Sequence, residues 1–329
     1  MVLNWGIISS GLISHDFVTA LGTLPKSDHN VVAVGARNLS DAKKFAKLHE
    51  IPKFYEGYDS VMNDPDVDIV YIGTINTKHF EVGMKALEAG KHVLCEKPLC
   101  MNEKQAKHLL DTAKEKKLFC MEAVWTRFFP AFTYLKKRIE DGDLGEVIEV
   151  EAALGHAGWG EVDRVRLKNL GGGTILDLGV YSIQAALWVI PEKPIEINAT
   201  GILNSDKVDS EMRAELKFQG NKIVRVSCSG IHSFHNSLIV TGTKGKMTVH
   251  SFWAPTSLTD IDGTRKTWKL PGAKHYFNFP NSCGLRYEAE EARKCIENGL
   301  LESPSMSHDE SLRIARIEDE CRKMIGHLG

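Results

Sequence analysis

The amino-acid sequence predicts an α/β protein of two domains: a doubly wound parallel sheet, followed by an α+β domain on a mostly antiparallel, open sheet. Up to about residue 122, continuous apolar runs alternate with segments at helical spacing, as in parallel strands covered by helices on both faces. Beyond residue 130, apolar and charged residues alternate, as in SEMRAELKF, which indicates a sheet with one covered face. A length of 329 residues suits two domains, which we expect at residues 1–125 and 126–329.

The predicted elements follow in order along the chain. Five apolar runs predict the strands of the first domain: WGIIS, NVVAVGA, DIVYIGT, KHVLCEK and LFCMEA. Between them, periodic segments predict helices at residues 13–24, 40–49, 79–89 and 102–116. For the second domain we expect a helix at 130–141, a strand at GEVIEVEAAL, a glycine-rich loop at 155–173 and a helix at 177–189. SHDE, at 307–310, is a capping box that opens a last helix ending near residue 325.

The balance of charges and the cysteines limit the expected partners. With 41 basic and 43 acidic residues the formal net charge is −2, so the chain lacks the basic footprint of a protein that binds nucleic acid or an anionic membrane. Seven scattered cysteines, without a C-x-x-C pair or a histidine cluster at zinc spacing, predict free thiols and no metal site. Because no signal-like or membrane-spanning run occurs in the sequence, we expect a cytoplasmic protein.

The first strand runs into a turn of small residues, LNWGIISSGLIS, before the first helix. A pyrophosphate needs helix N-terminal N–H groups and little side-chain bulk in such a turn, and the usual fingerprint is G-x-G-x-x-G or A. Here the three positions are Ser9, Gly11 and Ser14, which are small, and the serine hydroxyls can donate to phosphate. The turn is therefore either a dinucleotide site or an ordinary connection between a strand and a helix.

The end of the second strand, VVAVGARN, bears on which dinucleotide is bound. An NAD site usually places an acidic residue there, for the ribose 2′-hydroxyl. This sequence has Arg37 instead, and a guanidinium suits bidentate contact with a 2′-phosphate. NADP is therefore the expected cofactor, unless Arg37 is only a solvated side chain at a strand end.

Two later strands end in residues that suit a reactive centre. VLCEKPL places Glu96, Lys97 and Pro98 at the carboxyl edge of the parallel sheet, where such sheets bind ligands. GTINTKH places Asn76 and His79 on the same edge. Lys97 can then reach a nicotinamide or a substrate hydroxyl, and the alternative is a surface lysine before a helix.

The segment GGGTILDLGVYSIQ carries two polar side chains on one helix. Asp177 and Tyr181 are four residues apart and share a helical face. Gly179 between them costs about 1 kcal/mol relative to alanine, which indicates that another group approaches the backbone closely.

The tyrosine acts as a general acid or base if its pKa falls by about 3 units, or about 4 kcal/mol. One ammonium about 4 Å away supplies that much at an effective dielectric constant of about 20. Lys97 is the candidate ammonium, positioned by Asp177. The alternative is that Asp177 is a solvated first-turn acid and Tyr181 a core residue.

With these motifs, the chain resembles the Gfo/Idh/MocA oxidoreductase family along nearly its whole length. Within it, the segments WGIISSGLIS, VLCEKPL, MEAVWTRFFPA, LDLGVY and TGTKG are similar to the dimeric dihydrodiol dehydrogenases, and MEAVWTRFFPA is the most specific of them. The resemblance implies an N-terminal Rossmann domain, a C-terminal domain that forms a homodimer, and NADP-dependent oxidation of a carbinol carbon. One departure is that most of the family has Gly in place of Ser9 and Ala in place of Ser14, which bears on affinity for the cofactor.

The resemblance also implies roles for individual residues. It places the catalytic lysine, the aspartate and the final acid or base at Lys97, Asp177 and Tyr181. The residues expected at the cofactor are Ser9, Ser10, Gly11, Leu12, Ile13, Arg37, Thr74, Asn76, His79, Glu96 and Lys97. The residues expected at the substrate are Trp125, Arg127, Phe128, Trp253 and Phe279, of which the last two are alternatively core or loop packing.

The function that follows is transfer of a hydride to NADP from a trans-dihydrodiol or from an aldose such as D-xylose, with Tyr181 handling the hydroxyl proton. Two alternatives stay open. One is an NADPH-dependent keto-sugar or carbonyl reductase of the same family, and the other is a dinucleotide-binding sensor that has lost the chemistry. The sequence assigns no role to the loop at 155–173.

Overall fold

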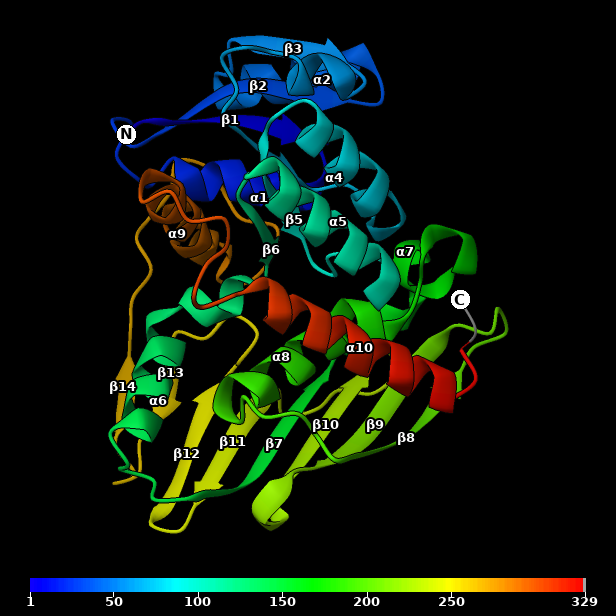
Figure 1. Ribbon diagram of the computed structural model, residues 1–329, viewed down its shortest axis with the longest axis vertical. Helices are drawn as coiled ribbons and strands as arrows, with labels where there is room; N and C mark the ends of the chain where they lie inside the picture. Colours follow the sequence, from blue (N-terminus) through cyan, green and yellow to red (C-terminus); the bar gives the residue numbers. More distant parts are fainter. Residues whose placement is uncertain (328–329) are drawn as a thin grey trace. The chain divides into compact units, whose positions relative to one another are not determined.

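The computed structural model describes residues 1–327, which form two compact units (Figure 1). The first unit combines Met1–Trp125 with Leu270–Ser311, and the second combines Thr126–Lys269 with the residues from Leu312 onward. The prediction of one uninterrupted second domain is therefore wrong for residues 270–311. This segment joins the first unit because the buried Asp16 carboxylate accepts the backbone N–H groups of Asn278 and Phe279, at 2.8 and 3.0 Å.

The sheet of the first unit is parallel and has the strand order β3-β2-β1-β4-β5-β6. Its strands are β1 Leu3–Ile8, β2 His29–Ala36, β3 Lys53–Glu56, β4 Ile69–Ile72, β5 His92–Glu96 and β6 Cys120–Ala123. This order is typical of a Rossmann fold, in which ligands bind where the strand order reverses, outside the carboxyl ends of the strands. The predicted doubly wound sheet is confirmed, although the short edge strand β3 was not among the predicted strands.

Helices connect the strands of the first unit. They are α1 Leu12–Leu21, α2 Leu39–His49, α3 Asp59–Met62, α4 His79–Glu88 and α5 Glu103–Lys116, and the returning segment adds α9 Leu285–Glu297. Helices α4 and α5 pack side by side, and α9 packs on α1 (Figure 1). Asparagine side chains cap two of them: Asn38 accepts the backbone N–H of Asp41 at the start of α2, and Asn102 does the same for Gln105 at α5.

The second unit is built on an eight-stranded sheet of order β14-β13-β12-β11-β7-β10-β9-β8. The strands are β7 Val147–Gly155, β8 Glu196–Leu203, β9 Asp209–Lys217, β10 Ile223–Ser229, β11 Ser237–Gly242, β12 Gly245–His250, β13 Ser257–Thr259 and β14 Arg265–Thr267. Strands β7 and β10 pair in parallel and the other neighbours are antiparallel, which confirms the predicted mostly antiparallel, open sheet.

One face of this sheet is covered and the other is polar. Helices α6 Pro130–Glu140 and α8 Val180–Val189 lie on the covered face (Figure 1). On the other face Arg225 forms ion pairs with Glu149 and Glu215. Charged residues thus alternate with buried ones, as the sequence predicted.

The segment before α8 is less regular. The glycine-rich loop holds three short turns, η3 Trp159–Glu161, α7 Asp163–Arg166 and η4 Lys168–Leu170, and is followed by a π-helical turn, η5 Ile175–Gly179. The last helix, α10 His308–Met324, is preceded by Ser307, whose Oγ accepts the backbone N–H of Glu310 at 3.2 Å. That contact confirms Ser307 as the helix N-cap, which is one half of the predicted capping box.

Two expectations about the whole chain can be compared with residues 1–327. All seven cysteines are free thiols, as expected, and their side chains are buried. None of the helices in this part of the chain has the length and apolar character needed to span a membrane.

Candidate active site

The turn between β1 and α1 is held by a serine in an unusual conformation. Ser9 has φ of +93°, in the region that normally favours glycine, and its Oγ accepts the backbone N–H of Gly11 at 3.2 Å. This hydrogen bond gives the serine a local partner that glycine lacks. It explains how the turn forms with Ser9 where the fingerprint has glycine.

Gly11 opens α1 as its N-cap, with φ of −75° and ψ of 176°, a conformation open to any residue. A Cβ added at Gly11 would come no closer to the rest of the protein than 3.4 Å, to Ser9 Oγ. That is an ordinary van der Waals distance, so the turn is not crowded at Gly11, and N–H groups at the start of a helix suit an anion there. The residues present fit a dinucleotide phosphate.

Ser14 does not belong to that open space. Its side chain is buried, and a Cβ on Gly73 would lie only 2.3 Å from its Oγ. Ile13 packs against the same glycine through Cγ2. The expectation that Ser14 offers a hydroxyl to phosphate is corrected: Ser14 is small because α1 approaches the end of β4 closely, and a Ser14→Leu change would disturb packing first.

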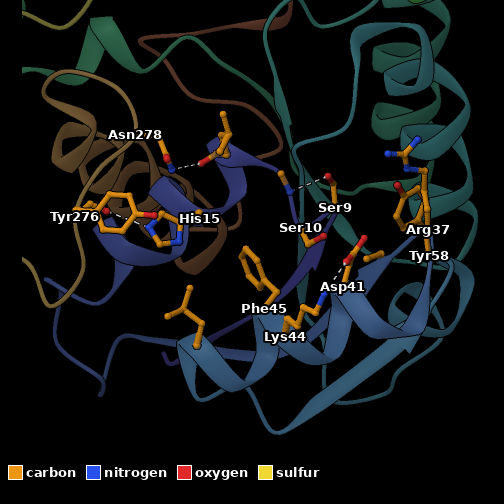
Figure 2. A pocket seen from close by; sticks show the side chains of 14 residues that line it. Ser9, Ser10, His15, Arg37, Asp41, Lys44, Phe45, Tyr58, Tyr276 and Asn278 are labelled. Carbon is orange, nitrogen blue, oxygen red and sulfur yellow. Dashed lines mark hydrogen bonds and ion pairs between the residues drawn. The ribbon is translucent and has the colours of Figure 1, made fainter.

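A cavity of about 460 Å³ adjoins the turn (Figure 2). Arg37 and Tyr58 lie at one side of it, and His15 and Tyr276 lie at the other. The cavity is lined by Ser9, Ser10, Gly11, Leu12, His15, Ala36, Arg37, Asp41, Lys44, Phe45, Leu48, Tyr58, Tyr276 and Asn278. The structure thus brings Arg37, which was predicted to bind a 2′-phosphate, to the same cavity as four of the five turn residues predicted to bind the cofactor.

The charges around Arg37 are mixed. Asp41 lines the cavity as well, and its carboxylate accepts the Asn38 side-chain amide at 2.8 Å. Lys44 lies 4.0 Å from that carboxylate. No acid stands at the strand end itself, as the sequence indicated, but the first turn of α2 brings Asp41 into the same cavity. Burial raises the pKa of the neighbouring Tyr58 hydroxyl, and the positive charge of Arg37 opposes that shift.

The far side of the cavity is bordered by imidazole rings. His15 Nε2 lies 3.0 Å from the carbonyl oxygen of Tyr276, and His49 Nε2 lies 3.0 Å from His15 Nδ1. Burial, together with the neighbouring His15 and His275, lowers the pKa of His49 to about 4. These contacts hold the returning segment against α1 and α2.

At the carboxyl edge of the sheet, the His79 side chain is buried and does not face an open site. Its ring is 1% exposed, with Nδ1 2.8 Å from the carbonyl oxygen of Pro98 and Nε2 3.0 Å from that of Thr74. Burial lowers its pKa. The role predicted for His79 is revised, because both ring nitrogens already face backbone carbonyls: it ties together two strand ends that were predicted to meet the cofactor.

Glu96 is the last residue of β5, and Lys97 comes directly after the strand. The Glu96 carboxylate is buried and accepts the Tyr71 hydroxyl at 2.6 Å and the backbone N–H of Lys97 at 3.2 Å. The Lys97–Pro98 peptide is cis, and the Lys97 side chain is half-buried. Asn76 begins the short 3-10 turn Asn76–Lys78 between β4 and α4, and its side-chain oxygen accepts the backbone N–H of Thr77 at 3.0 Å. These residues stand where strands β4 and β5 end.

In the second unit, Asp177 lies in the π-helical turn and is 8% exposed. Its two oxygens accept the indole N–H of Trp159 at 2.6 Å and Nη1 of Arg164 at 2.7 Å. The Arg164 guanidinium also lies over the Trp159 ring, 5.4 Å from its centre. The glycine-rich loop, which the sequence left without a role, therefore supplies two donors to the candidate catalytic aspartate.

Tyr181 follows on α8 and is 7% exposed. The helix approaches β10 closely at Gly179, where a Cβ would lie 3.2 Å from Sγ of Cys228. This confirms the prediction that another group approaches the backbone at Gly179. The π-helical turn and α8 together present Asp177 and Tyr181 from one continuous stretch of chain.

Arg127 does not fit the substrate role that was predicted for it. It is 1% exposed, its Nε and Nη2 donate to the side-chain and backbone oxygens of Gln184 at 3.2 and 3.3 Å, and its guanidinium lies over Trp188 at 5.2 Å. The correction has a simple physical reason: a buried guanidinium needs several acceptors, and α8 provides them. Arg127 fastens α8, which carries Tyr181.

The remaining predicted substrate residues are divided between the two units. Trp125 and Phe279 belong to the first unit, and Phe128 and Trp253 to the second. Trp125 is 4% exposed, whereas Phe128, Trp253 and Phe279 are partly exposed. The Trp253 ring packs edge-on against the ring of His156, with 5.3 Å between the ring centres. Trp253 therefore lies next to the start of the loop that holds Trp159.

Several residues of the candidate site were missed by sequence reasoning. Asp41 was visible as the acid of the N-x-x-D capping pattern NLSD, and Lys44 follows one turn later. Trp159 and Arg164 lie in a loop without periodicity, so no local signal linked them to Asp177. Within residues 1–327 no group of histidine, cysteine and acidic side chains is arranged to hold a metal.

Comparisons with known proteins agree with the fold. Residues 3–124 match the family model described as the oxidoreductase family with an NAD-binding Rossmann fold, and residues 132–248 match that of the GFO/IDH/MocA C-terminal domain. The trans-1,2-dihydrobenzene-1,2-diol dehydrogenase of Danio rerio is 44% identical over 328 residues, which cover 99% of this chain and 98% of the relative. The enzyme of the same name from Bos taurus is 42% identical over 329 residues, with the same coverage.

Two solved structures share the fold. The 3-ketoreductase KijD10 from Actinomadura kijaniata, in complex with NADP and TDP-benzene, superposes with a TM-score of 0.83 at 24% identity, covering 99% of this chain and 98% of the other. The aldose-aldose oxidoreductase from Caulobacter crescentus, in complex with glycerol, gives 0.84 at 22% identity, with coverage of 98% and 97%. At such identities the likeness concerns the fold.

Proposed function

The chain belongs to the Gfo/Idh/MocA oxidoreductase family, and from this premise we propose that it is an NADP-dependent dehydrogenase of trans-dihydrodiols or of aldoses such as D-xylose. The observation that carries the proposal is that Asp177 and Tyr181 stand on one stretch of helix in a chain whose full-length relatives are dihydrodiol dehydrogenases. The Rossmann domain of the family binds a nicotinamide dinucleotide, and the choice of NADP is part of the proposal.

The cofactor would be held by the turn and by the cavity beside it. Ser9, Ser10, Gly11 and Leu12 would contact its phosphates, and Arg37, supported by Lys44, would contact the 2′-phosphate. The residues proposed for the nicotinamide end are Thr74, Asn76, Glu96 and Lys97, with Ile13 and His79 behind them. When bound, the oxidised nicotinamide accepts a hydride.

The charges that line the cavity support a preference for NADP over NAD, and Asp41 makes that preference smaller. Arg37 and Lys44 carry two positive charges toward the cavity and Asp41 carries one negative charge, so the surplus is positive. A carboxylate close to a phosphate costs binding energy, because like charges repel at short range. We therefore expect NADP to be preferred, with a preference that Asp41 reduces.

The proton is the part of the reaction that this chain's side chains handle. Oxidation of a carbinol removes the hydrogen on carbon as a hydride and the hydroxyl hydrogen as a proton, and the product is a carbonyl, or a lactone from an aldose. Tyr181, in its phenolate form, would accept the proton of the substrate hydroxyl and would afterwards release that proton to solvent. Lys97 would supply the positive charge that lowers the pKa of Tyr181, and Asp177 would position that lysine while held by Trp159 and Arg164.

The substrate class follows from the side chains proposed to surround it. Phe128, Trp253 and Phe279 expose part of their rings, and Trp125 completes the proposed set. Aromatic faces suit both the apolar face of an arene diol and the C–H face of a sugar ring. We also propose that the enzyme is a cytoplasmic homodimer: the free thiols support a reducing compartment, and the dimer is what the resemblance of its motifs to the dimeric dihydrodiol dehydrogenases implies.

The experiment is a panel of trans-dihydrodiols, aldoses and keto-sugars, assayed with NADP and NAD in parallel by absorbance of the reduced cofactor. Tyr181→Phe is expected to lower kcat by roughly 10²- to 10⁴-fold, because the proton acceptor is removed, and to leave NADP binding unchanged. Tyr134→Phe is the matched control, since it loses a hydroxyl that donates to Asp260 elsewhere in the second unit.

Three results would contradict the proposal in different ways. Full activity of Tyr181→Phe would remove the proton role. A larger kcat/KM for keto-sugar reduction than for any oxidation would favour the reductase. Binding of NADPH without turnover of any substrate would favour a sensor, as a fold alone does not imply an activity.

A further inference from the structure

A buried, hydrogen-bonded pair of a histidine and a carboxylate lies in the unit that carries Asp177 and Tyr181. His327 Nδ1 is 2.6 Å from Asp209 Oδ1, and the two side chains are 4% and 0% exposed. Because an ionised carboxylate only accepts hydrogen bonds, Nδ1 of His327 is the donor. The pair joins two segments that are 118 residues apart in the sequence.

His327 reaches this place through the way in which α10 ends. Gly326 has φ of +82°, its N–H donates to the carbonyl of Lys323, and the N–H of His327 donates to the carbonyl of Arg322 at 2.9 Å. These two bonds form a Schellman motif, which reverses the chain after a helix. The residue after the glycine usually makes an apolar contact in this motif, whereas here it is a histidine facing a carboxylate.

The other oxygen of Asp209 holds the start of the π-helical turn. Oδ2 accepts the backbone N–H of Ile175 at 2.7 Å and the hydroxyl of Thr174 at 2.9 Å. Gly173 has φ of +136°, and a Cβ there would lie 2.6 Å from Asp209 Oδ1. The backbone is therefore shaped to let this carboxylate approach.

The consequence for the candidate site comes from the position of these contacts. Ile175 is the first residue of the π-helical turn, Asp177 is the third, and Tyr181 follows on the same stretch. A π-helical turn is a rare local geometry that is found frequently at functional sites, where surrounding contacts hold the strained backbone in place. Asp209 is bonded to the backbone at one end of this turn, and at the other end a Cβ on Gly179 would lie 3.2 Å from Sγ of Cys228.

We propose that Asp209 and His327 form a positioning pair for Asp177 and Tyr181: His327 fixes the carboxylate of Asp209, and Asp209 fixes the start of the turn. The inference deepens the proposed function and rests on it. Neither residue touches the substrate. The C-terminal end of α10 thereby contributes to the reaction through the backbone of residues 173–175.

The test compares His327→Ala with His327→Asn in the full-length enzyme. Asparagine places an N–H at about the position of Nδ1, so it keeps the bond to Asp209 without the imidazole. His327→Ala is expected to lower kcat roughly 10- to 100-fold, as a small misplacement of reacting groups does, while KM for NADP stays unchanged. His327→Asn is expected to recover most of the loss.

A second readout does not depend on activity. Hydrogen exchange of the peptide that spans residues 173–181 should be faster in His327→Ala and close to normal in His327→Asn. His250→Ala is the matched control, because that histidine is bonded to Thr259 in the same unit, away from the turn. Its exchange over residues 173–181 should equal that of the unaltered enzyme.

The outcomes separate the two proposals. If His327→Ala keeps the kcat of the unaltered enzyme, or if His327→Asn fails to rescue it, the positioning role is wrong. Unchanged exchange over residues 173–181 in His327→Ala also overturns it. If instead Tyr181→Phe retains full activity, the proposed function fails, and the exchange measurement still decides whether the pair orders the turn.

Discussion

The two regions that carry the proposed chemistry are built in opposite ways. The turn after β1 in the first unit borders a cavity of about 460 Å³, and one hydrogen bond of 3.2 Å, from the N–H of Gly11 to Oγ of Ser9, supports its conformation. The turn before α8 in the second unit is crowded, and the carboxylates of Asp177 and Asp209 each accept donors at distances from 2.6 Å.

The difference corresponds to two physical tasks. A dinucleotide brings its own charges and hydrogen-bond acceptors, so its site needs free backbone N–H groups and space. A proton-transfer site needs groups held in place before the substrate arrives, because misplacement lowers the rate steeply. Changes in the first region should therefore alter cofactor binding, and changes in the second should alter kcat.

The largest effect that would sharpen this comparison is expected at Asp177. Asp177→Asn removes the negative charge that Arg164 and Trp159 hold in place. We expect kcat to fall roughly 100-fold, as for loss of one preorganised electrostatic contact, with NADP affinity measured by fluorescence unchanged. Asp163→Asn is the control, because Asp163 forms an exposed ion pair with Arg166 in the same loop. A loss of NADP affinity in Asp177→Asn with normal kcat would break the comparison.

An effect of intermediate size is expected at Arg37, on the affinity for NADP and not on kcat. Arg37→Ala removes the guanidinium proposed to bind the 2′-phosphate, so the affinity for NADP should fall roughly 10- to 100-fold, the value of a charge-assisted hydrogen bond. The affinity for NAD and the kcat at saturating NADP should stay as they are. Titration of cofactor fluorescence with both dinucleotides measures this.

Asp41→Asn is the matched change of opposite sign, since it removes the acid in the same cavity and should raise the ratio of NADP to NAD affinity. Lys43→Ala controls for net charge, because Lys43 is exposed on α2 and does not line the cavity. Equal losses of NADP and NAD affinity in Arg37→Ala would refute the assignment of Arg37.

The smallest effect is expected at Ser9. Ser9→Gly loses one weak hydrogen bond but relieves a positive φ, whereas Ser9→Ala loses the bond and keeps the strain. The glycine variant should therefore be more stable than the alanine variant by about 1 kcal/mol. Urea denaturation of both variants measures the difference, and equal midpoints would show that the backbone at Ser9 stores no strain.

The parts of the fold that sequence reasoning predicted are those with a clear apolar pattern, either a continuous apolar run or a helical repeat. Five strands of the parallel sheet appear as continuous apolar runs, whereas β3 alternates between half-buried and exposed residues and lies at the sheet edge. Helix α9 was not among the predicted helices. One of its inward positions is Glu288, a buried carboxyl group that interrupts the apolar face. Burial, reinforced by the nearby Glu96, raises the pKa of Glu288 well above its usual value, which favours the uncharged form.

For the candidate site, the sequence by itself determined what is local: the small residues of the turn, Arg37 after the second strand, and the spacing of Asp177 and Tyr181. These follow from backbone geometry over a few residues.

Only the tertiary structure decided which distant polar groups meet. It placed Trp159 and Arg164 on Asp177, His327 on Asp209, and residues 270–311 on the first unit. The physical reason is that periodicity reports which side of an element is buried, whereas the partner of a buried polar group depends on the full three-dimensional packing around it.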